Sequence, residues 1–237
     1  MEKKVFFQEF LLAVERRFIS LPPEVLYSIC DYFFILQNEN AHTNLTAYQT
    51  IDDFIDFHFF DSRILLDCMN PISNAFIIDI GSGAGIPGII LHLLRPDLHV
   101  TLIESSQKKT RFLQKVIETL NINSCNIVNR RAEDAAHDSK WREKFDIATA
   151  RAFGPLSLTL ELTTSFVRPC GRIYLPRVAE EPKNTVDTQS LGCNLLDKFL
   201  YVLPRRDKTF SIDIFEKKKS TPSKFPRKVS QIKKNPL

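Results

Sequence analysis

The sequence predicts an α/β fold built on a doubly wound, mostly parallel sheet. Short β-branched runs alternate with helical patterns between residues 76 and 175. A glycine-rich segment, residues 81–88, follows the first of these runs. After the alternation, two further strand-like runs flank Pro204–Asp207 and predict a terminal hairpin. Because parallel strands need crossover helices between them, strand–helix alternation is typical of such a sheet.

Seven strands are predicted, each a short apolar or β-branched run bounded by turn residues. They cover residues 76–80, 99–103, 126–129, 145–150, 172–175, 198–203 and 209–216. Helices are predicted from Pro87, over 107–120 and over 155–166. Pro87 suits a first helical turn, where the N–H that proline lacks has no intrahelical partner anyway.

The residues before the sheet are predicted to be helical. Apolar positions recur at helical spacing over residues 5–19 and 24–38, and again from Asp52 to Leu66. We therefore divide the chain into a helical extension (1–70), an α/β domain (71–217) and a basic tail (218–237).

Composition is that of an ordinary globular protein, with 43% hydrophobic and 25% charged residues. No window approaches the roughly 20 apolar residues of a membrane span. The five cysteines are scattered without a C-x-x-C pair, which favours reduced core residues and a cytoplasmic location. The five histidines are equally dispersed, so no metal site is expected.

Charge is concentrated at the C-terminal end. From Tyr201 to Leu237 the sequence has eleven Lys and Arg against three Asp and Glu, although the whole chain carries only +4. A basic end on a mildly acidic body suits a polyanion such as RNA, but a disordered solubilising tail would look similar. From Lys217 onward Lys, Ser and Pro dominate, and we expect this tail to be mobile until it binds a partner.

The glycine-rich segment predicts an adenosine-containing cofactor. Gly81, Gly83 and Gly85 form G-x-G-x-G, while a second frame, beginning at Gly83, forms the dinucleotide pattern G-x-G-x-x-G. The dinucleotide pattern has its first glycine directly after the strand. Since the apolar run ends at Ile80, the frame that begins at Gly81 applies. That frame, with Asp79 inside the strand, favours a methyltransferase over a nicotinamide enzyme.

Glu104 stands at the end of the second predicted strand. An acidic side chain there can accept hydrogen bonds from ribose hydroxyls. Both nicotinamide and S-adenosylmethionine enzymes use such a residue, so it supports nucleoside binding without choosing between them. A solvated carboxylate at a strand end is the alternative.

Further motifs occur along the chain: N-L-T at 44–46, H-x-x-D-S at 58–62, D-x-G-x-G-x-G-x-P-G at 79–88, E-S-x-x-K-K at 104–109, R-A-E at 131–133, T-A-R-A at 149–152 and P-R-K at 226–228. Together they resemble the motifs of one family, the bacterial 16S ribosomal RNA guanine-N7 methyltransferases (small-subunit methyltransferase G, or glucose-inhibited division protein B). The resemblance runs from about residue 44 to the end. It implies a Rossmann-like class I methyltransferase domain and S-adenosylmethionine as the cofactor.

The resemblance also implies roles for individual residues. The expected cofactor-binding residues are Gly81, Gly83, Ile86, Glu104, Ala132, Glu133 and Arg151. Of these, Ala132 and Glu133 would lie beside the adenine, and Arg151 would face the cofactor or the target pocket. Without the family, Ala132 reads as helix packing and Arg151 as a surface ion pair.

The expected RNA-binding residues are Arg177, Arg227 and Lys228. The partner would be 16S ribosomal RNA or the small ribosomal subunit, and the protein is expected to act as a monomer without a membrane or a metal. His58 and Asp61 are three residues apart and would share a helix face, packed against the cofactor loop.

No catalytic side chain is expected. Guanine N7 has a lone pair and no proton, so methyl transfer to it needs alignment and charge stabilisation but no general base. Two other functions stay open at this point, a nicotinamide-dependent oxidoreductase and a non-catalytic RNA-binding module on a vestigial cofactor fold.

Overall fold

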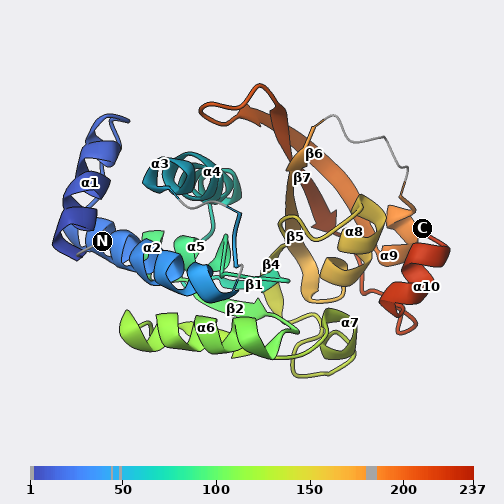
Figure 1. Ribbon diagram of the computed structural model, residues 1–237. Coiled ribbons are helices and arrows are strands. Elements are labelled where there is room, and N and C mark those ends of the chain that lie inside the picture. The colour runs from blue at the N-terminus through green and yellow to red at the C-terminus, as the bar shows by residue number, and fades with distance from the viewer. Residues whose placement is uncertain (1–2, 44, 48–49, 180–185) are drawn as a thin grey trace.

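The computed structural model describes residues 3–43, 45–47, 50–179 and 186–237, arranged around one mixed sheet (Figure 1). Seven strands make up the sheet, in the order β3-β2-β1-β4-β5-β7-β6. Their bounds are β1 Phe76–Ile80, β2 His99–Ile103, β3 Cys125–Val128, β4 Phe145–Thr149, β5 Val167–Val178, β6 Cys193–Val202 and β7 Thr209–Lys217.

The predicted fold class is confirmed. Strands β1 to β5 are parallel, and β7 pairs antiparallel with both β5 and β6, which is the predicted terminal hairpin. The largest difference is β5, which begins at Val167 and not at residue 172. Its early part pairs Val167 with Phe145 of β4 before an irregularity in the register, so a neighbouring strand extends it beyond its apolar run.

Helices cover both faces of the sheet. Their bounds are α1 Lys3–Glu15, α2 Pro23–Thr43, α3 Ile51–Phe54, α4 Phe60–Met69, α5 Gly88–Leu94, α6 Gln107–Thr119, α7 Ala132–Ala135, α8 Leu156–Thr164, α9 Thr188–Leu191 and α10 Val229–Lys234. Side chains alternate between faces along a strand. Accordingly, Ile77 belongs to the core formed with α2, α5 and α6, while Ile78 belongs to the core formed with α8 and α10.

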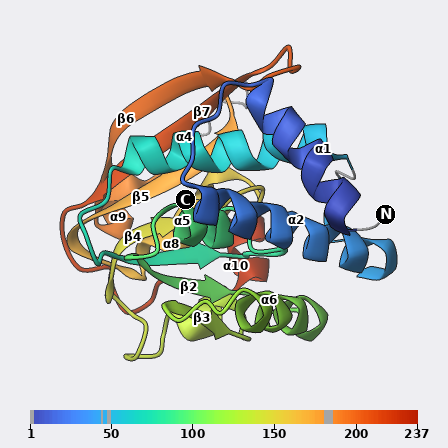
Figure 2. The same cartoon turned by 90° about the vertical axis from the view of Figure 1, so that its left-hand side faces the viewer.

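The N-terminal helices extend the α/β body. Phe6 of α1, Phe33 of α2 and Phe54 of α3 are buried in the same apolar core as Ile77 of β1. Figure 2 shows α1, α2 and α4 packed together beside the sheet. The predicted helix over 52–66 is present, but a π-helical turn, Ile55–Phe59, separates α3 from α4. The division at residue 70 stays a prediction.

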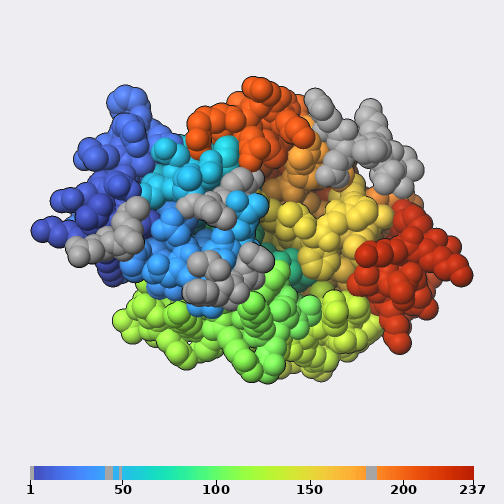
Figure 3. Space-filling view, viewed as in Figure 1, coloured from blue at the N-terminus to red at the C-terminus, as the bar shows by residue number. Residues whose placement is uncertain are grey.

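The C-terminal segment is packed, although the sequence predicts a mobile tail. Phe225 is 3% exposed and Ile232 of α10 is not exposed at all, and both join the core that contains α8. Figure 3 shows the segment, in red, against the yellow region of β4 and α8. The expectation of a mobile tail was wrong because it rested on the average composition of the segment. Two apolar side chains, Phe225 and Ile232, are enough to pack it on the core.

All five cysteines are free thiols, as predicted, but not all are core residues: Cys30 and Cys193 are buried, Cys68 and Cys125 are half-buried, and Cys170 is exposed. Within the described ranges no helix has the length and apolar character that crossing a membrane requires.

Candidate functional site

The glycine loop leaves β1 at Ile80 and lies at the carboxyl edge of the sheet. Gly81, Gly83 and Gly85 have φ values of +71°, +58° and +90°, a region that suits glycine because it lacks a Cβ. The Gly81 N–H donates to the carbonyl of Ile103 at 2.8 Å, which ties the loop to β2. A Cβ on Gly81 would overlap the ring of Phe153, so the loop and the segment after β4 touch at this position.

Glu104 lies beside this loop and is only 7% exposed. Its Oε2 accepts from the Gly83 N–H at 3.1 Å, and its Oε1 accepts from the Ser106 N–H at 2.7 Å. The burial of Glu104 and its two hydrogen bonds contradict the alternative that it is a solvated carboxylate at a strand end. A carboxylate has about four acceptor positions, so the two bonds leave capacity for the hydroxyls of a ribose.

Asp79 holds the far side of the loop. Its Oδ2 accepts from the N–H of Gly88, the first residue of α5, at 3.1 Å. Burial raises the pKa of Asp79 to about 7, partly offset by that hydrogen bond. Asp79 therefore has a structural role, which its position in the motif did not reveal. A second contact fixes the loop from the N-terminal helices, since the Tyr32 hydroxyl donates to the Ala84 carbonyl at 2.8 Å.

Ile86, Ala132 and Glu133 lie along the same carboxyl edge. Ile86 is half-buried against the core and precedes Pro87 through a cis peptide bond. Ala132 is buried and Glu133 half-buried in the first turn of α7, which follows β3. The parallel strands β1, β2, β3 and β4 all end at this edge. The predicted cofactor residues, which belong to four separate motifs, therefore lie along the same edge.

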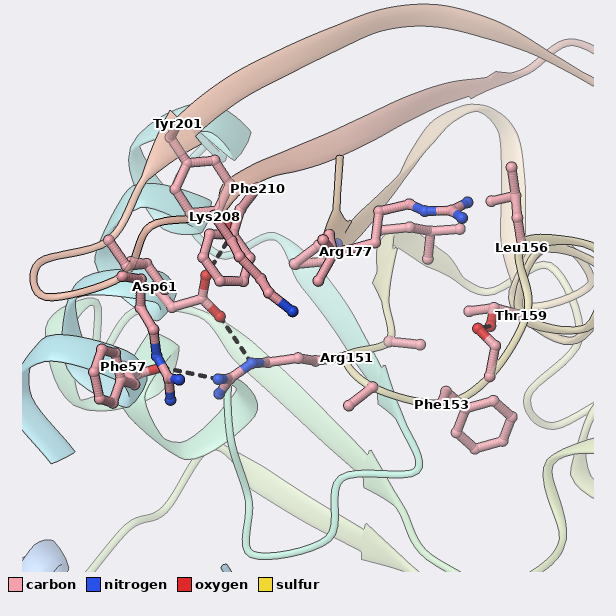
Figure 4. Close-up of a pocket in the computed structure, with 18 residues that line it drawn as sticks. Phe57, Asp61, Arg151, Phe153, Leu156, Thr159, Arg177, Tyr201, Lys208 and Phe210 are labelled. Atoms are coloured by element: carbon pink, nitrogen blue, oxygen red, sulfur yellow. Dashed lines mark hydrogen bonds and ion pairs between the residues drawn. The ribbon is translucent and has the colours of Figure 1, made fainter. Parts of the chain in front are cut away.

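Arg151, just after β4, is held by the N-terminal helices (Figure 4). Its Nε is 2.8 Å from Oδ2 of Asp61, its Nη1 is 3.0 Å from Nδ1 of His58, and its Nη2 donates to the Phe57 carbonyl at 2.8 Å. The Arg151 side chain is 20% exposed and that of Asp61 6%. One interpretation of Arg151 was a surface ion pair. The pair that it forms with Asp61 is instead partly buried.

The contacts of His58 define its protonation. An arginine can only donate, so Nδ1 of His58 accepts from Arg151 and the ring hydrogen is on Nε2. Nε2 is 2.9 Å from the Thr46 hydroxyl and donates to it. Burial, together with the Arg151 charge, lowers the pKa of His58 well below its usual value, which keeps the ring neutral. Asn44, the first residue of the N-L-T motif, lies outside the described residues.

One short segment, a π-helical turn followed directly by α4, supplies all three acceptors of Arg151. The turn contains Phe57 and His58, and α4 supplies Asp61. Tyr201 of β6 adds a hydrogen bond from its hydroxyl to Oδ1 of Asp61 at 2.5 Å. The sequence pattern placed His58 and Asp61 on one helix face but did not indicate that they face Arg151, since the π turn has no distinct residue pattern.

A pocket of about 370 Å³ opens next to Arg151. Its walls come from the loop after β4, the ends of β5 and β7, α8 and the β6–β7 turn; the lining residues include Phe57, Asp61, Arg151, Phe153, Leu156, Thr159, Arg177, Lys208 and Phe210. Figure 4 shows Phe153 and Lys208 on different sides of this pocket. Phe153 and Lys208 were not among the predicted site residues, although Phe153 directly follows the T-A-R-A motif.

The three predicted RNA-binding residues do not lie together. Arg177 lines the pocket, where its Nη1 is 3.6 Å from Asp213. Arg227, in the C-terminal segment, forms an ion pair with the buried Glu161 of α8, with Nη2 and Oε2 2.6 Å apart. Lys228 is exposed at the start of α10. For all three, contact with RNA stays a prediction, and the contacts of Arg227 favour an anchoring role. Among the described residues, no cluster of His, Cys, Asp and Glu is placed to hold a metal ion.

Comparison with known proteins identifies close sequence relatives. Residues 26–202 match the family model described as rRNA small subunit methyltransferase G. The ribosomal RNA small subunit methyltransferase G of Leuconostoc mesenteroides is 34% identical over 97% of this chain and 98% of its own length. The protein of the same name from Streptococcus pneumoniae serotype 19F is 35% identical over 87% of this chain and 89% of its own.

Solved structures share the fold at low sequence identity. A SAM-dependent methyltransferase from Aquifex aeolicus has a TM-score of 0.52 at 10% identity, covering 69% of this chain and 92% of that one. The [4+2]-cyclase SpnF also has a TM-score of 0.52, at 12% identity, covering 68% of this chain and 80% of that one. Since a cyclase and a methyltransferase share it, the fold alone does not decide the chemistry.

Proposed function

The chain belongs to the rRNA small subunit methyltransferase G family, and on this premise we propose that it methylates N7 of a guanosine in 16S ribosomal RNA with S-adenosylmethionine as donor. The observation that carries the proposal is the contact of Gly81 with Phe153. It joins the predicted cofactor loop to the pocket beside Arg151, at the carboxyl edge where the strand order reverses between β1 and β4. Open α/β sheets bind ligands at this switch point.

The residues at this edge fit an adenosyl cofactor. The Glu104 carboxylate would accept hydrogen bonds from the ribose hydroxyls, and the loop at Gly81 and Gly83 would let the backbone approach the ligand closely. Ala132 and Glu133 would lie beside the adenine, with Ile86 as an apolar contact. When bound, the cofactor supplies an electrophilic methyl group on a sulfonium.

Methyl transfer to N7 requires no general acid or general base from the protein. The sulfonium would supply its methyl group to the N7 lone pair, with the S–C bond giving way to the new N–C bond. No proton leaves, so the residues of this chain have to align the two reactants and exclude water. Arg151, tied to Asp61, His58 and Phe57, keeps the loop after β4 in one position beside the pocket.

One chain carries both the cofactor residues and the pocket, so a monomer suffices for this reaction. Ribosomal RNA as substrate implies a cytoplasmic site of action. The nicotinamide alternative gains nothing from the structure, because the sheet ends in the predicted hairpin, with the antiparallel β7 between β5 and β6. Such a terminal hairpin is typical of methyltransferase sheets and foreign to the dinucleotide-binding fold. Nor do the intact loop contacts of Glu104 favour a vestigial, non-catalytic module.

The test is direct methylation. Purified protein is incubated with methyl-labelled S-adenosylmethionine and either 16S ribosomal RNA or small ribosomal subunits, and the RNA is digested for nucleoside mass spectrometry. We expect 7-methylguanosine from at least one substrate. Label in another nucleoside would contradict the N7 assignment, and no label in either substrate would contradict the proposed function.

A further inference from the structure

We propose that the pocket beside Arg151 receives the target guanine after it has left its stack in the RNA, and that the ring of Phe153 is the surface on which the base stacks. This inference rests on the proposed function and adds to it a base-binding site and a positioning residue.

The size and place of the pocket suit a single nucleotide. Its volume of about 370 Å³ is at the lower end of the range for small-molecule sites, about 300–1,000 Å³. It opens at the carboxyl ends of β4 and β5, whereas the predicted cofactor residues Gly81 and Glu104 follow β1 and β2. Because β4 lies next to β1, the two sites are neighbours along one edge of the sheet.

Phe153 stands between these two sites. The ring packs over the Cα of Gly81, where a Cβ would overlap it, and it also lines the pocket. Phe153 is half-buried and therefore keeps part of its surface for a ligand. Its neighbours Ala152 and Gly154 have φ values of +51° and +144°. A non-glycine residue at positive φ costs free energy, and such conformations cluster at functional sites.

The chemistry of N7 requires an extruded base. In an A-form helix N7 faces the deep, narrow major groove, which protein side chains do not reach. A methyltransferase must therefore take the guanine from a loop or flip it out of its stack, and this loses the stacking of the base on its neighbours. An aromatic side chain in the receiving pocket replaces part of that interaction, since every base has a π-face.

The rim of the pocket is cationic on the side of the β6–β7 turn. Arg206 and Lys208 line it, and the Arg206 guanidinium lies 4.0 Å from the centre of the Phe57 ring. Arg205 fastens the turn to the N-terminal helices through Asp56, at 2.5 Å, and Asp53, at 3.0 Å. Phosphate contacts position a nucleic acid. An apolar wall with a basic rim thus matches a nucleotide whose base enters while its phosphates stay outside.

The experiment compares Phe153→Ala, Phe153→Leu and Phe153→Tyr by initial rates of methyl transfer at varied RNA concentration, with S-adenosylmethionine affinity measured by calorimetry. If the base stacks on the ring, the Ala and Leu variants lose roughly five- to a hundredfold in kcat/KM for RNA, and the Tyr variant falls least. The cofactor affinity of all three should stay near that of the unchanged protein. Phe76→Ala is the matched control, because Phe76 is an exposed aromatic at the opposite end of β1.

A purely structural role predicts the reverse order. If Phe153 only packs on Gly81, then Leu restores activity, Tyr does not, and Ala weakens cofactor binding. That pattern, or variants that all match the unchanged protein, would overturn the inference while leaving N7 methylation in place. An unchanged protein that transfers no methyl group would contradict the proposed function and this inference with it.

Discussion

Arg227 and Glu161 join the C-terminal segment to the α/β body. Nη2 of Arg227 donates to Oε2 of Glu161 at 2.6 Å, Nε donates to Oε1 at 3.0 Å, and the Arg227 backbone N–H donates to Oε1 at 2.8 Å. The Glu161 side chain is completely buried in α8. The arginine of the P-R-K motif thus neutralises a carboxylate inside the fold, next to the buried Phe225.

We expect Arg227→Met to destabilise the protein by about 3–5 kcal/mol, because it leaves Glu161 buried and unpaired. Urea unfolding measures this. Lys228→Met is the matched control, since the neighbouring lysine is exposed and its loss should change stability by no more than about 0.5 kcal/mol. An Arg227→Met protein of normal stability, but with lower RNA affinity and a flatter salt dependence, would return Arg227 to the RNA contact first expected of it.

Gly81→Ala should weaken S-adenosylmethionine binding far more than Gly83→Ala. Both glycines have positive φ, so alanine costs each about 1–2 kcal/mol of backbone strain. At Gly81 the new methyl also overlaps the Phe153 ring, whereas at Gly83 its nearest neighbour is the Gly81 carbonyl oxygen at 3.8 Å. Calorimetric titration of the two variants gives the difference directly. Equal affinities would mean that the cofactor does not depend on the Gly81 approach.

Glu104→Gln should lower S-adenosylmethionine affinity by roughly tenfold to over a hundredfold. A hydrogen bond to a charged group contributes about 1.5–3 kcal/mol, and the amide group would turn a donor toward either the Gly83 or the Ser106 N–H. Asp134→Asn, an exposed carboxylate in α7, serves as the control. A loss below twofold in calorimetry would show that Glu104 does not touch the cofactor.

His58 should make stability depend on pH. Its folded pKa is well below the usual 6.5, so between these two values the unfolded chain binds a proton that the folded chain does not. Stability from this group is therefore complete above about pH 6.5 and falls as the pH drops, by up to about 1.4 kcal/mol per pH unit. The measurement is the free energy of unfolding between pH 5 and pH 7.5.

The matched variant for this prediction is His58→Asn, whose side-chain oxygen can still accept from Arg151. It should remove that slope. Asp79, with a pKa raised to about 7, contributes the opposite slope, because its stability is lost as the pH rises toward 7. That contribution is common to both proteins and cancels in their difference. Identical pH profiles for His58→Asn and the unchanged protein would contradict the neutral, buried imidazole.

Local pattern was enough to predict the sheet and the edge at which the proposed cofactor residues lie. The β-branched runs that end at Ile80 and Ile103 form buried strands, and the glycines that follow Ile80 adopt positive φ. Strand propensity and tolerance of positive φ are properties of the residue types themselves. Strand–helix alternation then brings Gly81, Glu104 and Arg151 to one edge, since parallel strands share the direction of their carboxyl ends.

Only the tertiary structure decided what the charged residues contact. Arg151 with Asp61, and Arg227 with Glu161, are 90 and 66 residues apart in sequence, and each pairing depends on how the N-terminal or C-terminal segment packs on the sheet. An isolated arginine reads equally well as an RNA ligand, a surface charge or a buried anchor. Its role follows from which carboxylate the fold has buried next to it, because a buried charge requires a partner and an exposed one does not.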